Sequence, residues 1–240
     1  MAKSRYPVDA VGQVNSPAGT IQWPVEPIAL MGGTFDPIHY GHLRCAEEVR
    51  LKLGLDTLFL LPAGNPVHRA TPQASNSQRL DMLRLAQIEF PGLAIDQREL
   101  DREGPSYMFD TLQEIRSQWP GRPLLLLIGQ DSANDLDTWH RWQELFTLAH
   151  IIILSRPGSS VEYRPELEKQ VNKRKVDEPE ALTMQKAGCI LSLRVTAIDI
   201  CATTIKSMLR LGRTPDAMLP GRVMSYIRDN GLYLSKQMIT

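Results

Sequence analysis

From about Pro27 onward, short apolar runs alternate with longer amphipathic segments. The runs IALMGG, DTLFLLPA and HIIILSRPG have the length of buried strands, whereas HLRCAEEVRLKLG and QRLDMLRLAQIEF repeat apolar residues at helical spacing. The run PLLLLIG at 123–129 contains five consecutive aliphatic residues, which indicates a central parallel strand covered on both faces. The pattern predicts an α/β fold.

The same alternation continues to the end of the chain. It predicts strands at 93–96 and 189–195, a turn at 198–202, a solvated helical excursion at 161–186, and helices at 108–119, 139–148, 203–211 and 221–230. Alternating elements of these lengths imply a doubly wound parallel sheet, with a small C-terminal helical portion and ligands bound beyond the carboxyl ends of the strands. Residues 1–26 follow neither period, so we expect a poorly ordered leader before a single domain at 27–240.

Composition narrows the class of protein. The 240 residues are 42% hydrophobic, enough for one substantial core, and 27 basic residues balance 27 acidic ones. A net charge of zero favours neither nucleic acid nor an anionic membrane as a partner. Three widely spaced cysteines fit a reducing compartment, and no apolar run approaches the ~20 residues of a membrane span. We therefore expect a cytoplasmic protein, with a homo-oligomer left open.

The densest chemistry lies in GGTFDPIHYGH at 32–42, directly after the first apolar run. Gly32 and Gly33 let the backbone turn sharply and approach a ligand, and the helix that follows presents unpaired N–H groups that favour an anion. The stretch has neither the spacing of a dinucleotide fingerprint nor the Lys-Ser or Lys-Thr of a P-loop. Other side chains must therefore neutralise a bound phosphate.

Two histidines are suited to that role. His39 and His42 are three residues apart, so on a helix they share a face of the first turn, and each can donate a ring N–H to a phosphate oxygen. Gly41 permits close packing and Thr34 can add a donor, while Asp36 and Pro37 form a turn in which Asp36 is structural. Two alternatives stay open: a helix cap that happens to contain histidines, and a zinc site of His39, His42 and Cys45.

Several stretches, in order, resemble one family. GGTFDPIHYGH, LPAGNPVHR, SNSQRLDML, GPSYMFDTL, LLLIGQDSANDLDTWHRW, ILSRPG, ICATTIK and LPGRVMSYIRDNGLY resemble bacterial nicotinate-nucleotide adenylyltransferases, which are nucleotidylyltransferases with an HxGH element. The resemblance spans about residues 27–234 and implies a Rossmann-like nucleotidylyltransferase fold. It also implies transfer of the adenylyl group of ATP to nicotinate mononucleotide, with Mg²⁺ carried by ATP.

The resemblance also implies an ATP site. Its residues would be Gly32, Gly33, Thr34, Phe35, His39, His42, Gly129, Asp131, Thr203, Thr204 and Lys206, with His39, His42 and Lys206 catalytic and no metal ligand assigned. The turn ICATTIK departs from the family twice, because Cys201 replaces a serine that would cap the helix and Lys206 replaces an arginine. Asp131 as a simple turn cap and Lys206 as an exposed helix residue remain alternatives.

A mononucleotide site is implied in the same way. Trp139 would stack on the pyridine ring with the backbone N–H of His140 near the carboxylate, although Trp142 competes for this role. Met108 stands where the family often has threonine, so a contact there would use the backbone. His68, Arg69 and Arg156 would face substrate phosphates unless they are solvated loop residues. The competing functions are the same chemistry on nicotinamide mononucleotide or pantetheine phosphate, and a non-catalytic nucleotide-binding module.

Overall fold

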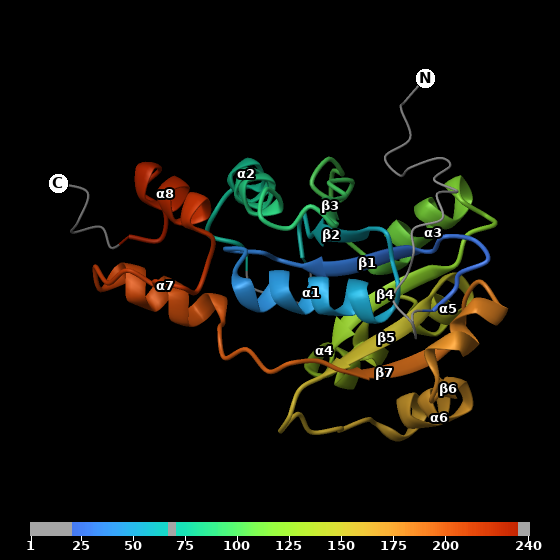
Figure 1. Ribbon diagram of the computed structural model, residues 1–240. Helices are drawn as coiled ribbons and strands as arrows, with labels where there is room; N and C mark the ends of the chain where they lie inside the picture. The colour runs from blue at the N-terminus through green and yellow to red at the C-terminus, as the bar shows by residue number, and fades with distance from the viewer. Residues whose placement is uncertain (1–20, 67–70, 235–240) are drawn as a thin grey trace.

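The computed structural model of the chain describes residues 21–66 and 71–234. Within these residues, seven strands form one parallel sheet in the order β3-β2-β1-β4-β5-β7-β6 (Figure 1). The strands are β1 Ile28–Gly33, β2 Leu58–Pro62, β3 Leu93–Ile95, β4 Leu124–Gly129, β5 His150–Ser155, β6 Lys175–Val176 and β7 Ile190–Arg194. The predicted doubly wound parallel sheet is confirmed.

Helices cover both faces of this sheet. The α-helices are α1 Tyr40–Lys52, α2 Asn76–Gln87, α3 Met108–Gln118, α4 Gln130–Asn134, α5 Trp142–Leu148, α6 Pro165–Arg174, α7 Ala202–Arg210 and α8 Gly221–Asp229, and two 3₁₀ segments are η1 Leu136–Thr138 and η2 Pro179–Met184. Buried apolar residues of α1, α2, α7 and α8 belong to one apolar cluster, and those of α3, α4, α5 and α6 belong to a second. The sheet separates the two clusters.

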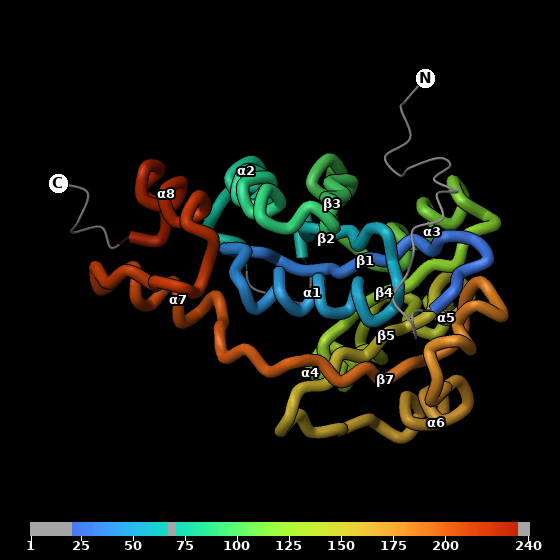
Figure 2. The backbone as a smooth tube through the Cα atoms, viewed as in Figure 1, coloured from blue at the N-terminus to red at the C-terminus, as the bar shows by residue number. Residues whose placement is uncertain are grey.

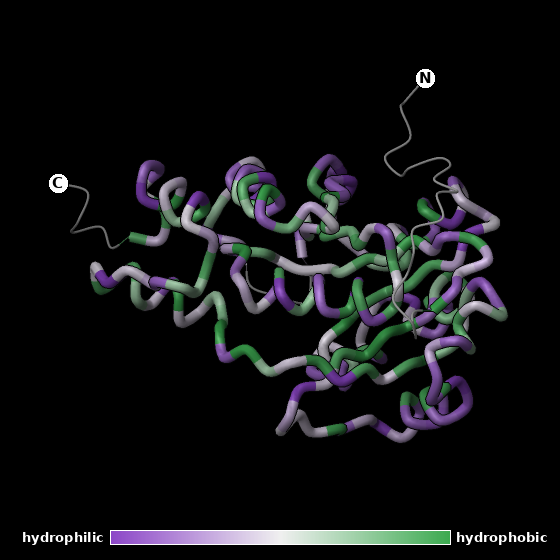
Figure 3. The backbone as a smooth tube through the Cα atoms, viewed as in Figure 1, coloured by the Kyte–Doolittle hydropathy of each residue, from purple (hydrophilic) through white to green (hydrophobic). Residues whose placement is uncertain are grey.

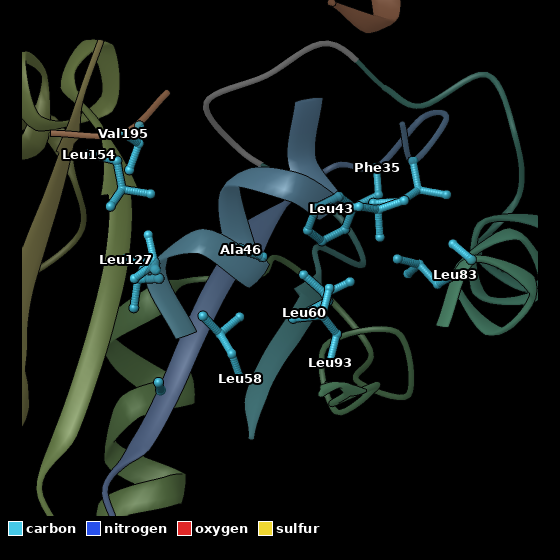
Figure 4. Close-up of a cluster of buried hydrophobic side chains, with 14 of the residues drawn as sticks. Phe35, Leu43, Ala46, Leu58, Leu60, Leu83, Leu93, Leu127, Leu154 and Val195 are labelled. Atoms are coloured by element: carbon cyan, nitrogen blue, oxygen red, sulfur yellow. The ribbon is translucent and has the colours of Figure 1, made fainter. Parts of the chain in front are cut away.

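The alternation of strand side chains explains why two cores form. Along β4, Leu125 and Leu127 join the first cluster, whereas Leu124, Leu126 and Ile128 join the second. Successive side chains of a strand point to opposite faces, so an unbroken aliphatic run fits a strand with helices on both sides. Figure 4 shows part of the first cluster between α1, β2 and the central strands, and Figure 3 shows the hydrophobic colour following the strands.

The order of the strands determines where a ligand can bind. The chain passes from β1 outward to β2 and β3, then returns to place β4 on the other side of β1. The loops after β1 and β4 therefore diverge to opposite faces, and this switch point is the usual binding crevice of such sheets. The α7 and α8 helices lie at one end of the molecule, where α7 contacts the loop after β1 (Figure 2).

Two predicted segments differ from the structure. The helix expected over 139–148 begins at Trp142, because η1 ends at Thr138 and Trp139 has an extended backbone. Only part of the segment 161–186 is the helix α6, and the segment also contributes the two-residue edge strand β6 beside β7. No described helix is long and apolar enough to cross a membrane.

The expected leader divides into two parts. Residues 1–20 lie outside the described residues, whereas residues 21–26 pack against the domain. Ile21 is buried, and the indole N–H of Trp23 donates to the carbonyl of Leu53 at 2.7 Å. The carboxylate of Glu26 accepts the N–H of Asp56 at 3.1 Å, and its backbone carbonyl accepts the guanidinium of Arg122 at 2.6 Å.

Glu26 predicts a pH-dependent change in stability. Burial raises the pKa of its carboxyl from 4.5 to about 7, so charging it costs more in the folded than in the unfolded chain. Stability is therefore lost as pH rises from 4.5 to about 7. We expect Glu26→Gln to raise the free energy of unfolding by about 1–2 kcal/mol at alkaline pH, since part of the side chain is solvated, with no gain in acid. Urea unfolding of both proteins below pH 4.5 and above pH 7 measures the free energy of unfolding. An equal gain in stability in acid and in alkali would contradict the prediction.

Candidate active site

The loop after β1 turns sharply at Gly33 and Phe35. A Cβ added to Gly33 would lie 2.8 Å from the Phe35 ring, and Phe35 itself adopts a left-handed backbone with φ of 49°. The Phe35 ring is buried in the first cluster, near Leu43 (Figure 4), and contacts His42 edge-on with ring centroids 5.1 Å apart. Its side chain therefore packs inside the fold and supports His42.

His39 and His42 lie together at the start of α1. Their rings stack with centroids 3.7 Å apart and planes at 23°. His39 is only 4% exposed, and among the described residues its Nδ1 has no hydrogen-bond partner. Burial, with the charge of Arg156, lowers the pKa of His39 to about 4, so the ring is neutral at pH 7. A buried ring nitrogen without a partner is costly unless a ligand satisfies it.

Gly41 makes this arrangement sterically feasible. A Cβ at position 41 would lie 2.9 Å from His39 Nδ1 and 2.9 Å from the carbonyl oxygen of Ile200. Any larger residue would collide with the His39 ring and with the chain that enters α7, and would push the two apart. The expected need for glycine between the histidines thus has a specific cause.

Asp36, in the loop after β1, bonds this loop to the segment before α2, to α7 and to the turn after α8. Its carboxylate accepts the backbone N–H groups of Gln73 at 3.0 Å and Ala74 at 3.1 Å, the ammonium of Lys206 at 3.0 Å and the hydroxyl of Tyr233 at 2.7 Å. Burial by itself raises the pKa of this carboxyl, but the four donors outweigh it and hold the pKa below its usual range. Asp36 is ionised and structural, as predicted from its place in the turn.

Arg79 is a supporting residue that the sequence reasoning missed. Its fully buried guanidinium donates to the carbonyl oxygens of Thr34 and Ala63 and to Asn76 Oδ1, each at 2.7 Å. Burial lowers its pKa. Its position in the helix could have revealed it, because Arg79 has helical spacing from the apolar residues on the buried face of α2, which are Met82, Leu83 and Ala86. An arginine in the apolar stripe of a helix points into the fold, so only acceptors inside the fold can satisfy its hydrogen-bond donors.

The start of α7 approaches the same loop. The expected loss of a cap at Cys201 is corrected, because its sulfur accepts the N–H of Thr204 at 3.5 Å and lies 3.1 Å from the Thr204 hydroxyl oxygen. These contacts lower the pKa of the thiol. Thr203 is exposed one residue before Thr204, and Lys206, one turn into the helix, reaches Asp36. The structure thus brings Lys206 beside the loop, held by an ion pair.

Gly129, Asp131 and Arg156 line one depression at the carboxyl ends of β4 and β5. Its volume is about 260 Å³. Asp131 is exposed in the first turn of α4, and Arg156 follows β5 with its backbone N–H bonded to the Ser159 hydroxyl at 3.2 Å. The charge of Arg156 also acts on His39 and Cys45, so its side chain lies within electrostatic reach of the start of α1. Residues from two strand ends can therefore contact one ligand.

The residues predicted for the pyridine site lie at the start of α3 and on the segment before α5. Met108 begins α3, and its Cε lies 3.3 Å from a Cβ built on Gly32, at the end of β1. The Tyr107 ring contacts the exposed His140 ring at 4.5 Å. Trp139 and Trp142 are both half-buried against the second cluster, and Trp142 also packs edge-on against Phe146 with centroids 6.1 Å apart. His68 and Arg69 lie outside the described residues.

The zinc interpretation has little support from the geometry. The imidazoles of His39 and His42 stack face to face, and burial raises the pKa of the Cys45 thiol to about 11. A zinc ligand must be a thiolate, so this cysteine is poorly prepared for the role. Among residues 21–66 and 71–234, no group of three or more His, Cys, Asp or Glu side chains could hold a metal.

Comparisons with known proteins identify the family. The model of the family described as "Cytidylyltransferase-like" matches residues 30–204. The "Probable nicotinate-nucleotide adenylyltransferase" of Methylococcus capsulatus is 47% identical over 207 residues, covering 86% of this chain and 99% of that protein. The protein of the same description from Acidithiobacillus ferrooxidans is 43% identical, with 87% and 96% covered.

A solved structure agrees at the level of fold. The Plasmodium falciparum nicotinic acid mononucleotide adenylyltransferase complexed with NaAD has a TM-score of 0.66 and 14% identity, and the match covers 87% of this chain and 98% of that one. The same enzyme complexed with APC gives a TM-score of 0.64. The sequence matches extend over nearly the whole length of the relatives, and the family model covers the loop after β1, the helix α1 and the first residues of α7. The chain therefore belongs to the nicotinate-nucleotide adenylyltransferases, within the cytidylyltransferase-like family.

Proposed function

We propose that the enzyme transfers the adenylyl group of ATP to nicotinate mononucleotide, giving nicotinate adenine dinucleotide and pyrophosphate. A phosphate oxygen of the mononucleotide attacks the α-phosphorus of ATP, and the bond from that phosphorus to the bridging oxygen of pyrophosphate breaks. The observation that carries the proposal is the stacked histidine pair, in which buried His39 has an Nδ1 without a partner among the described residues, at the strand-to-helix junction. A triphosphate oxygen would satisfy that nitrogen.

The chemistry suits these residues. The attacking phosphate is already an anion at pH 7, so the site needs no strong base, and catalysis depends on positioning and on stabilising charge. His39 and His42 can donate ring N–H groups to charge that develops at the α-phosphate. Lys206, in its ion pair with Asp36, adds a cation beside the loop.

We assign the binding residues as follows. ATP is contacted by the loop and helix ends at Gly32, Gly33, Thr34, Phe35, His39, His42, Gly129, Asp131, Thr203, Thr204 and Lys206. Nicotinate mononucleotide is contacted by Met108, Trp139, His140 and Arg156, with His68 and Arg69 from the segment outside the described residues. Two contacts support this division. Met108 lies beside Gly32 at the end of β1, and its neighbour Tyr107 contacts His140, so the residues assigned to the mononucleotide adjoin the loop assigned to ATP.

A divalent cation generally accompanies ATP in nucleotidyltransferases, and we propose that it is Mg²⁺. The described residues offer no carboxylate cage for it, and the four donors around Asp36 already satisfy that carboxylate. Mg²⁺ keeps several waters and is commonly bound through substrate phosphates. It would therefore enter with ATP. We also propose a cytoplasmic location, in keeping with three unpaired cysteines.

Pyrophosphate release tests the reaction. The purified protein is incubated with MgATP and either nicotinate mononucleotide, nicotinamide mononucleotide or pantetheine phosphate. We expect the fastest release with nicotinate mononucleotide. Release only with another acceptor would reassign the substrate, and ATP binding without release would indicate a non-catalytic module.

The pyridine site predicts a selective binding defect. Trp139→Ala should raise the KM for nicotinate mononucleotide by about tenfold, because an aromatic contact and its buried area are lost, while the KM for ATP stays near the wild-type value. Trp142→Ala is the matched control, since Trp142 packs against the same cluster as Trp139 and its ring also contacts Phe146. Steady-state kinetics of both variants measures this. A loss confined to ATP, or an equal defect in the control, would contradict the assignment.

A further inference from the structure

The C-terminal turn after α8 is bonded directly to the loop after β1. Tyr233 is 8% exposed and donates its hydroxyl to Asp36 Oδ1 at 2.7 Å, across 197 residues of sequence. On the other oxygen of the same carboxylate, Lys206 Nζ lies 3.0 Å from Oδ2 and 5.9 Å from the Tyr233 ring centroid. Three segments far apart in the chain thus share one buried carboxylate.

This arrangement limits the movement of Lys206. A lysine side chain is a flexible stem with a compact charge, so it needs an anchor to act at a fixed point. Its side chain is 20% exposed, and an ammonium has three donors, of which the bond to Asp36 uses one. Within residues 21–66 and 71–234 the other two donors have no hydrogen-bond partner, so they are available to a phosphate.

Tyr233 also affects how strongly Asp36 holds the lysine. The tyrosine hydroxyl and the backbone N–H groups of Gln73 and Ala74 supply three of the four donors to the carboxylate. Hydrogen bonds to a charged group share its charge, so the ammonium faces a partly compensated anion. Without the hydroxyl, the carboxylate keeps three donors instead of four, so Asp36 and the lysine bonded to it are less firmly fixed.

We propose that Tyr233 and Asp36 are positioning residues that hold the Lys206 ammonium at the triphosphate site, so that the C-terminal turn is part of the ATP site. The inference rests on the proposed function in that it takes the loop after β1 to bind the ATP phosphates. It concerns ATP affinity and not the identity of the acceptor.

The molecule contains a matched control for this role. Tyr226, on α8, donates its hydroxyl to Asp81 Oδ2 of α2 at 3.0 Å. This bond also joins a C-terminal tyrosine to an aspartate of the domain, but it does not involve the loop after β1. Tyr233→Phe and Tyr226→Phe therefore remove similar bonds, of which only one reaches Lys206.

Calorimetric titration with adenosine 5′-(β,γ-methylene)triphosphate and Mg²⁺ compares the two variants, with thermal unfolding in parallel. We expect Tyr233→Phe to weaken analogue binding by about tenfold, the loss of one hydrogen bond to a charged group, and Tyr226→Phe to leave it within twofold. Similar decreases in Tm would show that the difference is not one of stability. Unchanged affinity in Tyr233→Phe, or an equal loss in Tyr226→Phe, overturns the proposal.

A coupling experiment tests the route through Lys206. In a Lys206→Met background, adding Tyr233→Phe should cause no further loss of affinity, because the residue it positions is gone. Additive losses would overturn the proposal. If Tyr233→Phe folds poorly, Asp36→Asn replaces it, and unchanged affinity in that variant has the same meaning.

The titration also separates this inference from the proposed function. It needs neither an acceptor nor turnover, so a protein that releases no pyrophosphate with any pyridine nucleotide but shows the expected affinities would retain the inference and lose the function. A wild-type protein that does not bind the analogue would overturn the inference itself.

Discussion

Replacing His42 with alanine is expected to lower kcat by about 10²–10³-fold, or ~2.7–4 kcal/mol of transition-state stabilisation. The imidazole is held by stacking on His39 at 3.7 Å and by the edge contact with Phe35 at 5.1 Å. Such a preorganised donor acts mainly on charge that develops in the transition state, so the KM for nicotinate mononucleotide should change much less. Pyrophosphate release at saturating substrates measures the effect.

A second substitution separates donation from packing. His42→Phe keeps an aromatic ring against His39 and Phe35 but removes both ring nitrogens, so it should be about as slow as His42→Ala. Full activity in the phenylalanine variant would mean that the ring only fills space. An unchanged kcat in the alanine variant would remove His42 from the catalytic machinery altogether.

Arg79→Met should be among the most destabilising single changes in this protein, at about 3 kcal/mol. The substitution leaves the carbonyl oxygens of Thr34 and Ala63 without their buried donor, and each unsatisfied group costs about 1–3 kcal/mol. The net effect is smaller than the sum because the buried guanidinium is itself costly, as its lowered pKa indicates. Urea unfolding at pH 7 gives the free energy directly.

The control lies five residues further along the same helix. Arg84 is well exposed and lies 3.7 Å from Asp81, so Arg84→Met removes a similar side chain from the surface of α2. Exposed ion pairs contribute less than about 1 kcal/mol, and we expect a loss within that limit. Equal losses in the two variants would show that the bonds of Arg79 to the loop do not stabilise the fold.

Local pattern predicted the strands and helices that are buried most completely. The aliphatic run at 124–128 is β4, and the amphipathic runs after the first two strands are α1 and α2. The pattern predicted less well where the backbone conformation changes within a few residues. Trp139 is an example, because it lies between η1 and α5 with an extended backbone.

The stretch GGTFDPIHYGH by itself placed the two histidines together, because residues three apart at the start of a helix share a face. The need for glycine at position 41 also depends on the fold, since a Cβ there would lie 2.9 Å from the carbonyl oxygen of Ile200. The partners of Asp36 and Arg79 depended on the tertiary structure. Lys206 and Tyr233 lie 170 and 197 residues from Asp36 in sequence, and only the crossover of the sheet and the return of the C-terminal turn bring them together. Helical spacing is a local geometric constraint, whereas a buried charge is satisfied by whichever donors the packed fold places around it.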